Sequence, residues 1–168
     1  LLDRRQAWRI AALSTACALV LGAAIVFLRE PAAIWIGLVG LVLGWSYHGP
    51  PLKLAYRGWG ELDVVVVYGP IVVMATYVVM AGEWSWPAFT AALPLGLVIA
   101  AFLWVNEFPD CAADRRAGKM NLVARMGKAR SARLYPLWYL GALAVTLTLP
   151  LTGLPRTLWL GACFVPAA

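Results

Sequence analysis

Two acidic side chains, Asp110 and Asp114, lie in a polar segment of an otherwise apolar chain, residues 106–119. Because they are four residues apart, a helix would place both carboxylates on one face, one turn from each other. At a separation of about 6 Å and an effective dielectric of about 20, their repulsion would cost about 2.8 kcal/mol. A hard divalent cation removes this repulsion, since Mg²⁺ binds carboxylate oxygens and completes its shell with water and phosphate oxygens. We therefore interpret the segment as half of a Mg²⁺–diphosphate site.

The acidic pair also has a simpler interpretation, as two solvated loop carboxylates beside basic residues. Its context favours the site, because Pro109 suits the first turn of a new helix and Asn106 suits a cap or bend. The pair would then lie on a short helix just beyond a membrane span, with both carboxylates facing the opening of the helical bundle. The cations that follow, Arg115, Arg116 and Lys119, would bind phosphate oxygens.

A second polar segment, residues 48–63, contains Lys53 and Arg57 after a G-P-P turn. We interpret these two cations as a clamp for a diphosphate leaving group; ordinary basic charge beside a membrane is the alternative. Tyr47 and His48 precede the turn. They either contact an aromatic acceptor and its hydroxyl or are simply an interfacial aromatic and a polar residue at a helix end. His48 is the only histidine, which excludes a multi-histidine metal site within this chain.

The composition predicts an all-α, polytopic transmembrane helical bundle. Hydrophobic residues make up 62% of the chain and charged residues only 13%, whereas about a quarter is charged in a typical soluble domain. We treat residues 1–168 as a single membrane domain. The chain begins with Leu1 and stops within an apolar run, so we expect it to be part of a longer protein.

Apolar runs separated by polar turns predict six membrane spans. In the third, the run of valines would favour a strand in water, but in lipid an open strand leaves its backbone unsatisfied, so a helix is expected. Pro70 should kink this helix, and Gly37, Gly40 and Gly44 should form a smooth stripe for close helix packing in the second span. The predicted spans are residues 10–28, 32–47, 64–81, 87–105, 134–149 and a segment that begins near residue 157.

The basic residues predict how the spans are oriented. Twelve of the fourteen lysines and arginines lie in the lead-in and in segments 48–63 and 106–133, and the alternate turns hold only Arg29 and Arg156. By the positive-inside rule these basic segments are cytoplasmic, so both segments that carry the site lie on one face of the cell membrane. The basic residues behind the net charge of +6 then set the membrane topology and contact anionic lipid, and we do not expect a nucleic-acid partner.

Two motifs resemble a known family. The run N-E-F-P-D-x-x-x-D-x-x-x-G-K, which begins at Asn106, resembles the second aspartate-rich motif of the UbiA superfamily of intramembrane prenyltransferases. The run Y-x-x-P-P-L-K-L-x-Y-R-G-x-G-E, from Tyr47 to Glu61, is similar to the preceding loop of members that act on 1,4-dihydroxy-2-naphthoate in menaquinone biosynthesis. The basic lead-in resembles the segment just after the family's first aspartate motif.

This resemblance implies a nine-helix bundle with a cavity open to lipid, of which this chain would hold about six helices and lack the first aspartate motif. It implies that Asp110 and Asp114 bind Mg²⁺ and that Lys53 and Lys119 contact the diphosphate. Further assignments place Arg57 and Arg115 at the diphosphate and Tyr47, His48 and Asn106 at the acceptor.

The activity expected from the resemblance is transfer of a polyprenyl group from a polyprenyl diphosphate to an aromatic acceptor, with membrane lipid around the site. Asp110, Asp114 and Lys53 would be the catalytic residues, and 1,4-dihydroxy-2-naphthoate is the preferred acceptor. The alternatives are a member with another acceptor (4-hydroxybenzoate, homogentisate, a porphyrin or a lipid) and a membrane transporter or structural protein. A phosphatidyl-alcohol transferase is disfavoured because its D-G-x-x-A-R signature does not occur in this chain.

Overall fold

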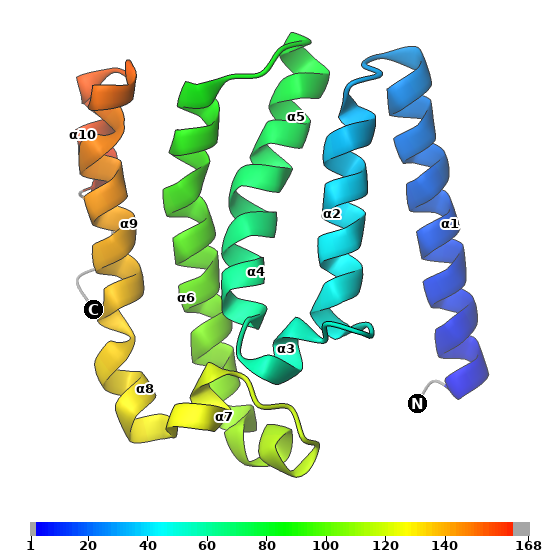
Figure 1. The fold of residues 1–168 in the computed structure, drawn as a ribbon, viewed down its shortest axis with the longest axis vertical. Helices are drawn as coiled ribbons and strands as arrows, with labels where there is room; N and C mark the ends of the chain where they lie inside the picture. Colours follow the sequence, from blue (N-terminus) through cyan, green and yellow to red (C-terminus); the bar gives the residue numbers. More distant parts are fainter. Residues whose placement is uncertain (1–2, 163–168) are drawn as a thin grey trace.

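The computed structural model describes residues 3–162, which are helical with no strand among them. The all-α prediction is therefore confirmed. The long helices stand side by side and alternate in direction, from α1 at one edge to α9 at the other (Figure 1). The elements are α1 (Arg4–Leu28), α2 (Ala33–His48), α3 (Leu54–Arg57), α4 (Gly60–Val66), the π-helical η1 (Val67–Ile71), α5 (Val72–Ala81), α6 (Trp86–Arg116), α7 (Leu122–Met126), α8 (Lys128–Leu134), α9 (Pro136–Thr148), the 3-10 turns η2 (Leu149–Thr152) and η3 (Arg156–Leu158), and α10 (Trp159–Ala162).

Four of the described helices are long and apolar enough to cross a membrane: Arg4–Leu28, Gly60–Ala81, Trp86–Arg116 and Lys128–Thr152. The apolar helix α2 is shorter, at 16 residues. These five helices coincide with the first five predicted spans. The sixth predicted span begins near residue 157, where α10 is its only described helix, and the rest of that prediction lies outside the described residues.

The environment of Pro109 differs from the prediction. It does not begin a new helix, because α6 runs without a break from Trp86 to Arg116 and holds both Pro94 and Pro109 in its interior. A proline removes one backbone donor and usually breaks a helix. Here the helix continues because its final turns pack against α7, with Cys111 of α6 buried in the same cluster as Val123 of α7. Tertiary packing of this kind supplies most of a helix's stability. The acidic pair thus lies on the continuation of a membrane-spanning helix.

Close helix packing occurs at glycines other than those expected. A Cβ added at Gly69 would lie 2.8 Å from the carbonyl oxygen of Ala92, and one at Gly96 would collide with the carbonyl oxygen of Val65. The segment α4–η1 therefore approaches α6 backbone to backbone. In the predicted stripe, only Gly40 is closely approached, by the side chain of Ile71. Nothing lies within 4 Å of a Cβ added at Gly37 or Gly44. Next to this contact, the helix adopts π geometry around Pro70, the residue at which a kink is predicted.

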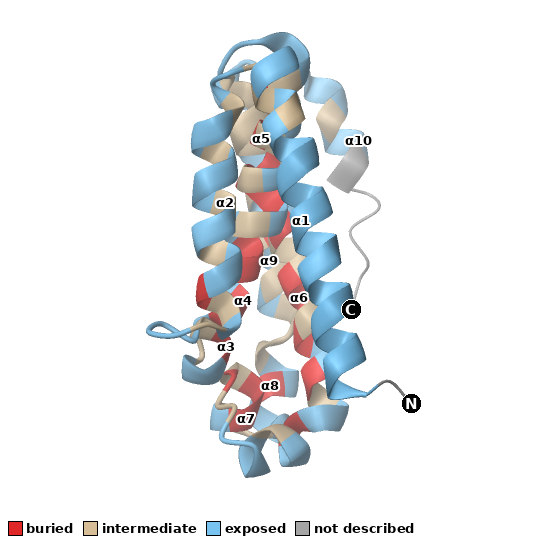
Figure 2. Cartoon of the chain, turned by 90° about the vertical axis from the view of Figure 1, so that its right-hand side faces the viewer, coloured by how far each residue is buried: buried red, intermediate tan, exposed pale blue. Residues whose placement is uncertain are grey.

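Burial of polar side chains is concentrated at one end of the bundle. Helix α1 contains no buried residue and is mostly exposed along its length in Figure 2. Buried apolar residues such as Met74 and Ala100 extend along the other helices, whereas the buried polar residues gather at the basic end, where α3, α4, α7 and the end of α6 meet. Exposed apolar helices suit a lipid environment, whereas this packed end has the polar side chains that form the candidate site.

Candidate functional site

The two polar segments predicted to share one face are joined by hydrogen bonds. The backbone N–H of Leu122, at the start of α7, donates to Glu61 Oε1 at 2.7 Å, and the N–H of Met120 donates to the Tyr56 carbonyl at 3.3 Å. Arg125 Nε in turn donates to the Met120 carbonyl at 2.7 Å. The segment after α6 is therefore fastened to α3 and α4, as the adjacent positions of α3 and α7 in Figure 1 illustrate.

The acidic pair sits in two different environments. Asp114 Oδ2 accepts a hydrogen bond from Asn121 Nδ2 at 2.8 Å and pairs with Lys119 Nζ at 3.3 Å, which leaves its side chain 16% exposed. Asn121 also caps α7, because its Oδ1 accepts from the N–H of Ala124 at 2.7 Å. Asp110 is exposed on the preceding turn of α6. Asp114 is thus held in place by its neighbours, and Asp110 is accessible.

The cations predicted to bind diphosphate lie at this end of the bundle in different settings. Lys53 and Arg57 are both exposed, Lys53 with a left-handed backbone (φ 47°) just before α3 and Arg57 at its end. Lys119 is partly buried beside Asp114. Arg115 Nε donates to the Ala124 carbonyl at 2.6 Å, so this hydrogen bond links the end of α6 to α7. The structure therefore gathers all four residues around one polar end, with Arg115 also in a supporting contact.

The site prediction missed three buried carboxyl groups. Glu61, Glu107 and Asp63 are 0%, 4% and 7% exposed, and each has one oxygen with no hydrogen-bond partner among the described residues. Glu107 lies beside Glu61, so α4 and α6 bring two carboxyl groups together inside the protein. Burying a polar group without a partner is unfavourable. Their position was the one signal in the sequence, since Glu61 and Asp63 precede the third predicted span and Glu107 follows the fourth.

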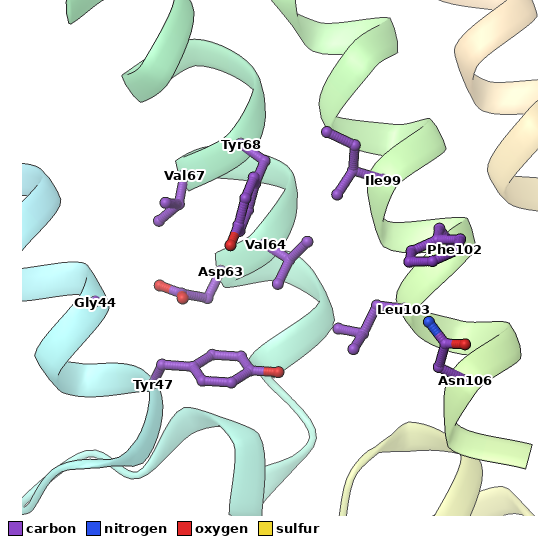
Figure 3. A pocket seen from close by; sticks show the side chains of 10 residues that line it. All are labelled: Gly44, Tyr47, Asp63, Val64, Val67, Tyr68, Ile99, Phe102, Leu103 and Asn106. Carbon is purple, nitrogen blue, oxygen red and sulfur yellow. The ribbon is translucent and has the colours of Figure 1, made fainter. Parts of the chain in front are cut away.

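A cavity of about 450 Å³ opens between α2, α4, η1 and α6. This volume lies within the usual range for small-molecule sites. Its walls are mainly apolar, and Figure 3 shows the polar side chains of Tyr47, Asp63, Tyr68 and Asn106 among them. The lining residues are Gly44, Tyr47, Asp63, Val64, Val67, Tyr68, Ile99, Phe102, Leu103 and Asn106.

The cavity brings together two of the three residues predicted to contact an acceptor. Tyr47 and Asn106 line it, while His48 is exposed outside it, with its ring centroid 4.6 Å from that of Tyr47 and 6.0 Å from that of Tyr56. Asn106 and Asp110 are four residues apart on α6, so they share a side of the helix. The exposed aspartate therefore lies one turn beyond the cavity wall.

A family model described as the UbiA prenyltransferase family matches residues 1–168. The chain belongs to the UbiA prenyltransferase family. The resemblance inferred from the two motifs is thereby confirmed, and the apolar helices of this UbiA member are those of a multi-pass membrane protein.

Two relatives to which this UbiA chain is similar have a naphthoate or a naphthoquinone in their names. It is 32% identical over 146 residues to the 1,4-dihydroxy-2-naphthoate octaprenyltransferase of Mycobacterium tuberculosis, covering 87% of the chain and 49% of the relative. It is 34% identical over 89 residues to the 2-carboxy-1,4-naphthoquinone phytyltransferase of Synechocystis, covering 53% of the chain and 29% of the relative. The chain thus spans half or less of the length of these relatives. No solved structure matches it.

The UbiA chain therefore combines three chemical environments at one end of the bundle. Two carboxylates lie on the last turns of α6, Lys119 pairs with one of them and other cations lie at the same end, and an apolar cavity with a few polar groups begins one helical turn away. Such an arrangement can hold an anionic group at the membrane surface while an apolar substrate extends toward the lipid.

Proposed function

We propose that the full-length protein containing this chain transfers a polyprenyl group from a prenyl diphosphate to an aromatic acceptor, and that the acceptor is 1,4-dihydroxy-2-naphthoate. The observation that carries the proposal is the meeting of segments 48–63 and 106–133 at one end of an apolar bundle, directly beside the cavity. A charged leaving group and a lipid-soluble chain need these two environments side by side. The names of the relatives support the choice of a naphthoate.

The donor set of the aspartate motif fits part of a Mg²⁺ site. Asp110 and Asp114 offer hard carboxylate oxygens one turn apart. Within residues 3–162 no group of three or more histidine, cysteine or acidic side chains is placed to hold a metal ion. Mg²⁺ commonly binds through one or two carboxylates and substrate phosphates, so two aspartates from this chain suffice for a half-site. When bound, Mg²⁺ would act as a Lewis acid toward the diphosphate.

The chain's cations would stabilise the departing diphosphate. Lys53 and Arg57 approach it from the α2–α4 segment and Lys119 from the segment after α6, so the leaving group is held from two sides. In the reaction the allylic carbon–oxygen bond breaks, an electron-rich ring carbon bonds to the allylic carbon, and the ring loses a proton or, if carboxylated, CO₂. The apolar cavity walls would exclude water, which would otherwise capture the allylic cation.

The proposed location is the cell membrane, with the site on the cytoplasmic face. The lead-in, α3 and α7–α8 lie at the same end of the bundle (Figure 1), and these segments carry most of the basic residues. Positive charge on one set of loops is the usual signature of the cytoplasmic side.

The test is a transfer assay with the purified full-length protein. Labelled geranylgeranyl diphosphate and Mg²⁺ would be supplied with 1,4-dihydroxy-2-naphthoate, 4-hydroxybenzoate or homogentisate in parallel reactions. We expect a prenylated naphthoate product that does not form when EDTA removes the metal. Product with only another acceptor would overturn the naphthoate assignment, and no product with any acceptor would overturn prenyl transfer.

A further inference from the structure

Two buried carboxyl groups, Glu61 of α4 and Glu107 of α6, have no role in the proposed reaction. They are 0% and 4% exposed, and their side chains lie within hydrogen-bonding reach of each other. Glu61 Oε1 accepts from the Leu122 N–H at 2.7 Å, but Glu61 Oε2 and Glu107 Oε2 have no hydrogen-bond partner in the described part of the chain. An ionised carboxylate only accepts hydrogen bonds, so two ionised groups would meet here without a donor.

The charges around this pair do not stabilise it. Two like charges in contact are unfavourable, and burial adds the cost of removing each from water. The titratable groups nearby are Tyr47 from α2, Asp63 from α4, Asp114 from α6 and Lys119 from the segment after α6. Lys119 is the one cation among these four, and its Nζ is already 3.3 Å from Asp114 Oδ2. A second cation to neutralise the pair is therefore missing from this set.

The space around the two unpartnered oxygens determines what can neutralise them. Both oxygens are sealed inside the protein, and a water molecule needs a polar cavity of about 10–15 Å³. A water or a metal ion is thereby excluded, whereas a proton needs no cavity. One proton removes one of the two charges and converts an acceptor into a donor, which satisfies both carboxyl groups at once.

We propose that Glu61 and Glu107 share one proton, and that Glu107 is a positioning residue that holds Glu61 against the Leu122 N–H. The part of this inference that concerns catalysis rests on the proposed function. Leu122 follows Asn121, whose Nδ2 donates to Asp114 Oδ2 at 2.8 Å. The shared proton therefore joins α4 and α6 at the point where the start of α7 holds one aspartate of the motif.

The first experiment detects the proton without turnover. Infrared spectra of the purified full-length protein at neutral pH would be compared between the wild type and Glu107→Gln in the region of the protonated carboxyl stretch. We expect the variant to lose the absorption of one protonated carboxyl group. Glu83→Gln, which alters an exposed acid in the turn after α5, is the matched control and should keep the wild-type spectrum in this region.

The second experiment measures the pH dependence of kcat with the same full-length protein. Glutamine at position 107 keeps a donor toward Glu61, so Glu107→Gln should retain most of the wild-type kcat at neutral pH. Glu107→Ala removes the donor and should lower kcat by about 10–100-fold, as does loss of a group that orients a metal ligand. When the pH rises and the shared proton leaves, the wild type should lose kcat, whereas Glu107→Gln should keep it. Both proteins receive the same acceptor, so ionisation of the acceptor affects them equally.

Three outcomes would overturn the inference. The carboxyl absorption of Glu107→Gln could equal that of the wild type, its pH profile could superimpose on the wild-type profile, or Glu107→Ala could transfer prenyl groups at the wild-type rate. If Glu107→Ala fails to fold, the glutamine variant still decides through its spectrum and its pH profile. Absence of transfer in the wild type would instead refute the proposed function, and the infrared spectra would still decide whether the two glutamates share a proton.

Discussion

The two aspartates of the UbiA motif, identical in type and one turn apart, have different surroundings. Asn121 and Lys119 hold Asp114 in place, whereas Asp110 is exposed. Loss of Asp114 would therefore disturb the cap of α7 as well as a proposed Mg²⁺ ligand. Asp110 provides the cleaner test, because its side chain contributes little to the packing.

Asp110→Asn in the full-length protein should lower prenyl transfer by about 100-fold or more. Residues that merely support a metal ligand already cost about 10–100-fold when removed, so a direct ligand should cost at least as much. The midpoint of thermal unfolding should not move, because the aspartate is exposed. Initial rates at saturating Mg²⁺ together with thermal unfolding would measure both effects. An Asp110→Asn protein with wild-type rates would remove this residue from the metal site.

Between elements, Glu61 connects α4 to α7 through its hydrogen bond from the Leu122 N–H. Glu61→Ala leaves that buried donor unpaired and should destabilise the protein by about 1–3 kcal/mol. Glu61→Gln keeps an oxygen acceptor and removes a charge beside Glu107, so it should be close to wild type in stability. Thermal unfolding and protease cleavage within residues 106–133 would measure the difference. If the two variants unfold at the same temperature and are cleaved at the same rate, the hydrogen bond from the Leu122 N–H to Glu61 does not hold the two segments together.

The close approach of α4–η1 to α6 gives a second prediction at this scale. Gly96→Ala would force a methyl group against the Val65 carbonyl, and such overpacking should cost about 1–3 kcal/mol. Gly37→Ala is the matched control, because its methyl group meets nothing within 4 Å. That variant should be neutral or gain about 0.5–1 kcal/mol from reduced backbone entropy. Thermal unfolding in detergent measures both; a Gly96→Ala protein as stable as the control would contradict the contact.

For the whole molecule, the distribution of charge predicts a topology. Cysteines introduced at Ala117 and Glu83, both exposed and at opposite ends of α6, should react differently in intact cells that express the otherwise cysteine-free protein. A membrane-impermeant maleimide should label the residue 83 variant directly and the residue 117 variant only after permeabilisation. The reverse pattern would place the site outside the cell and contradict the positive-inside assignment.

Much of this molecule follows from the sequence alone. The apolar runs determine the helices and their order because lipid leaves the backbone no alternative. The motif beginning at Asn106 and the run from Tyr47 to Glu61 determine the family. These features are local or periodic, so a reader of the sequence can recover them.

Only the tertiary structure decided which side chains are removed from solvent and what they meet. Glu61, Glu107 and Asp63 look like ordinary charges beside a membrane span until α4 and α6 pack and bury them. Pro109 resembles a helix start until α7 supports the turns beyond it. Burial and cavity lining depend on contacts between residues tens of positions apart, and neither spacing nor composition encodes those contacts locally.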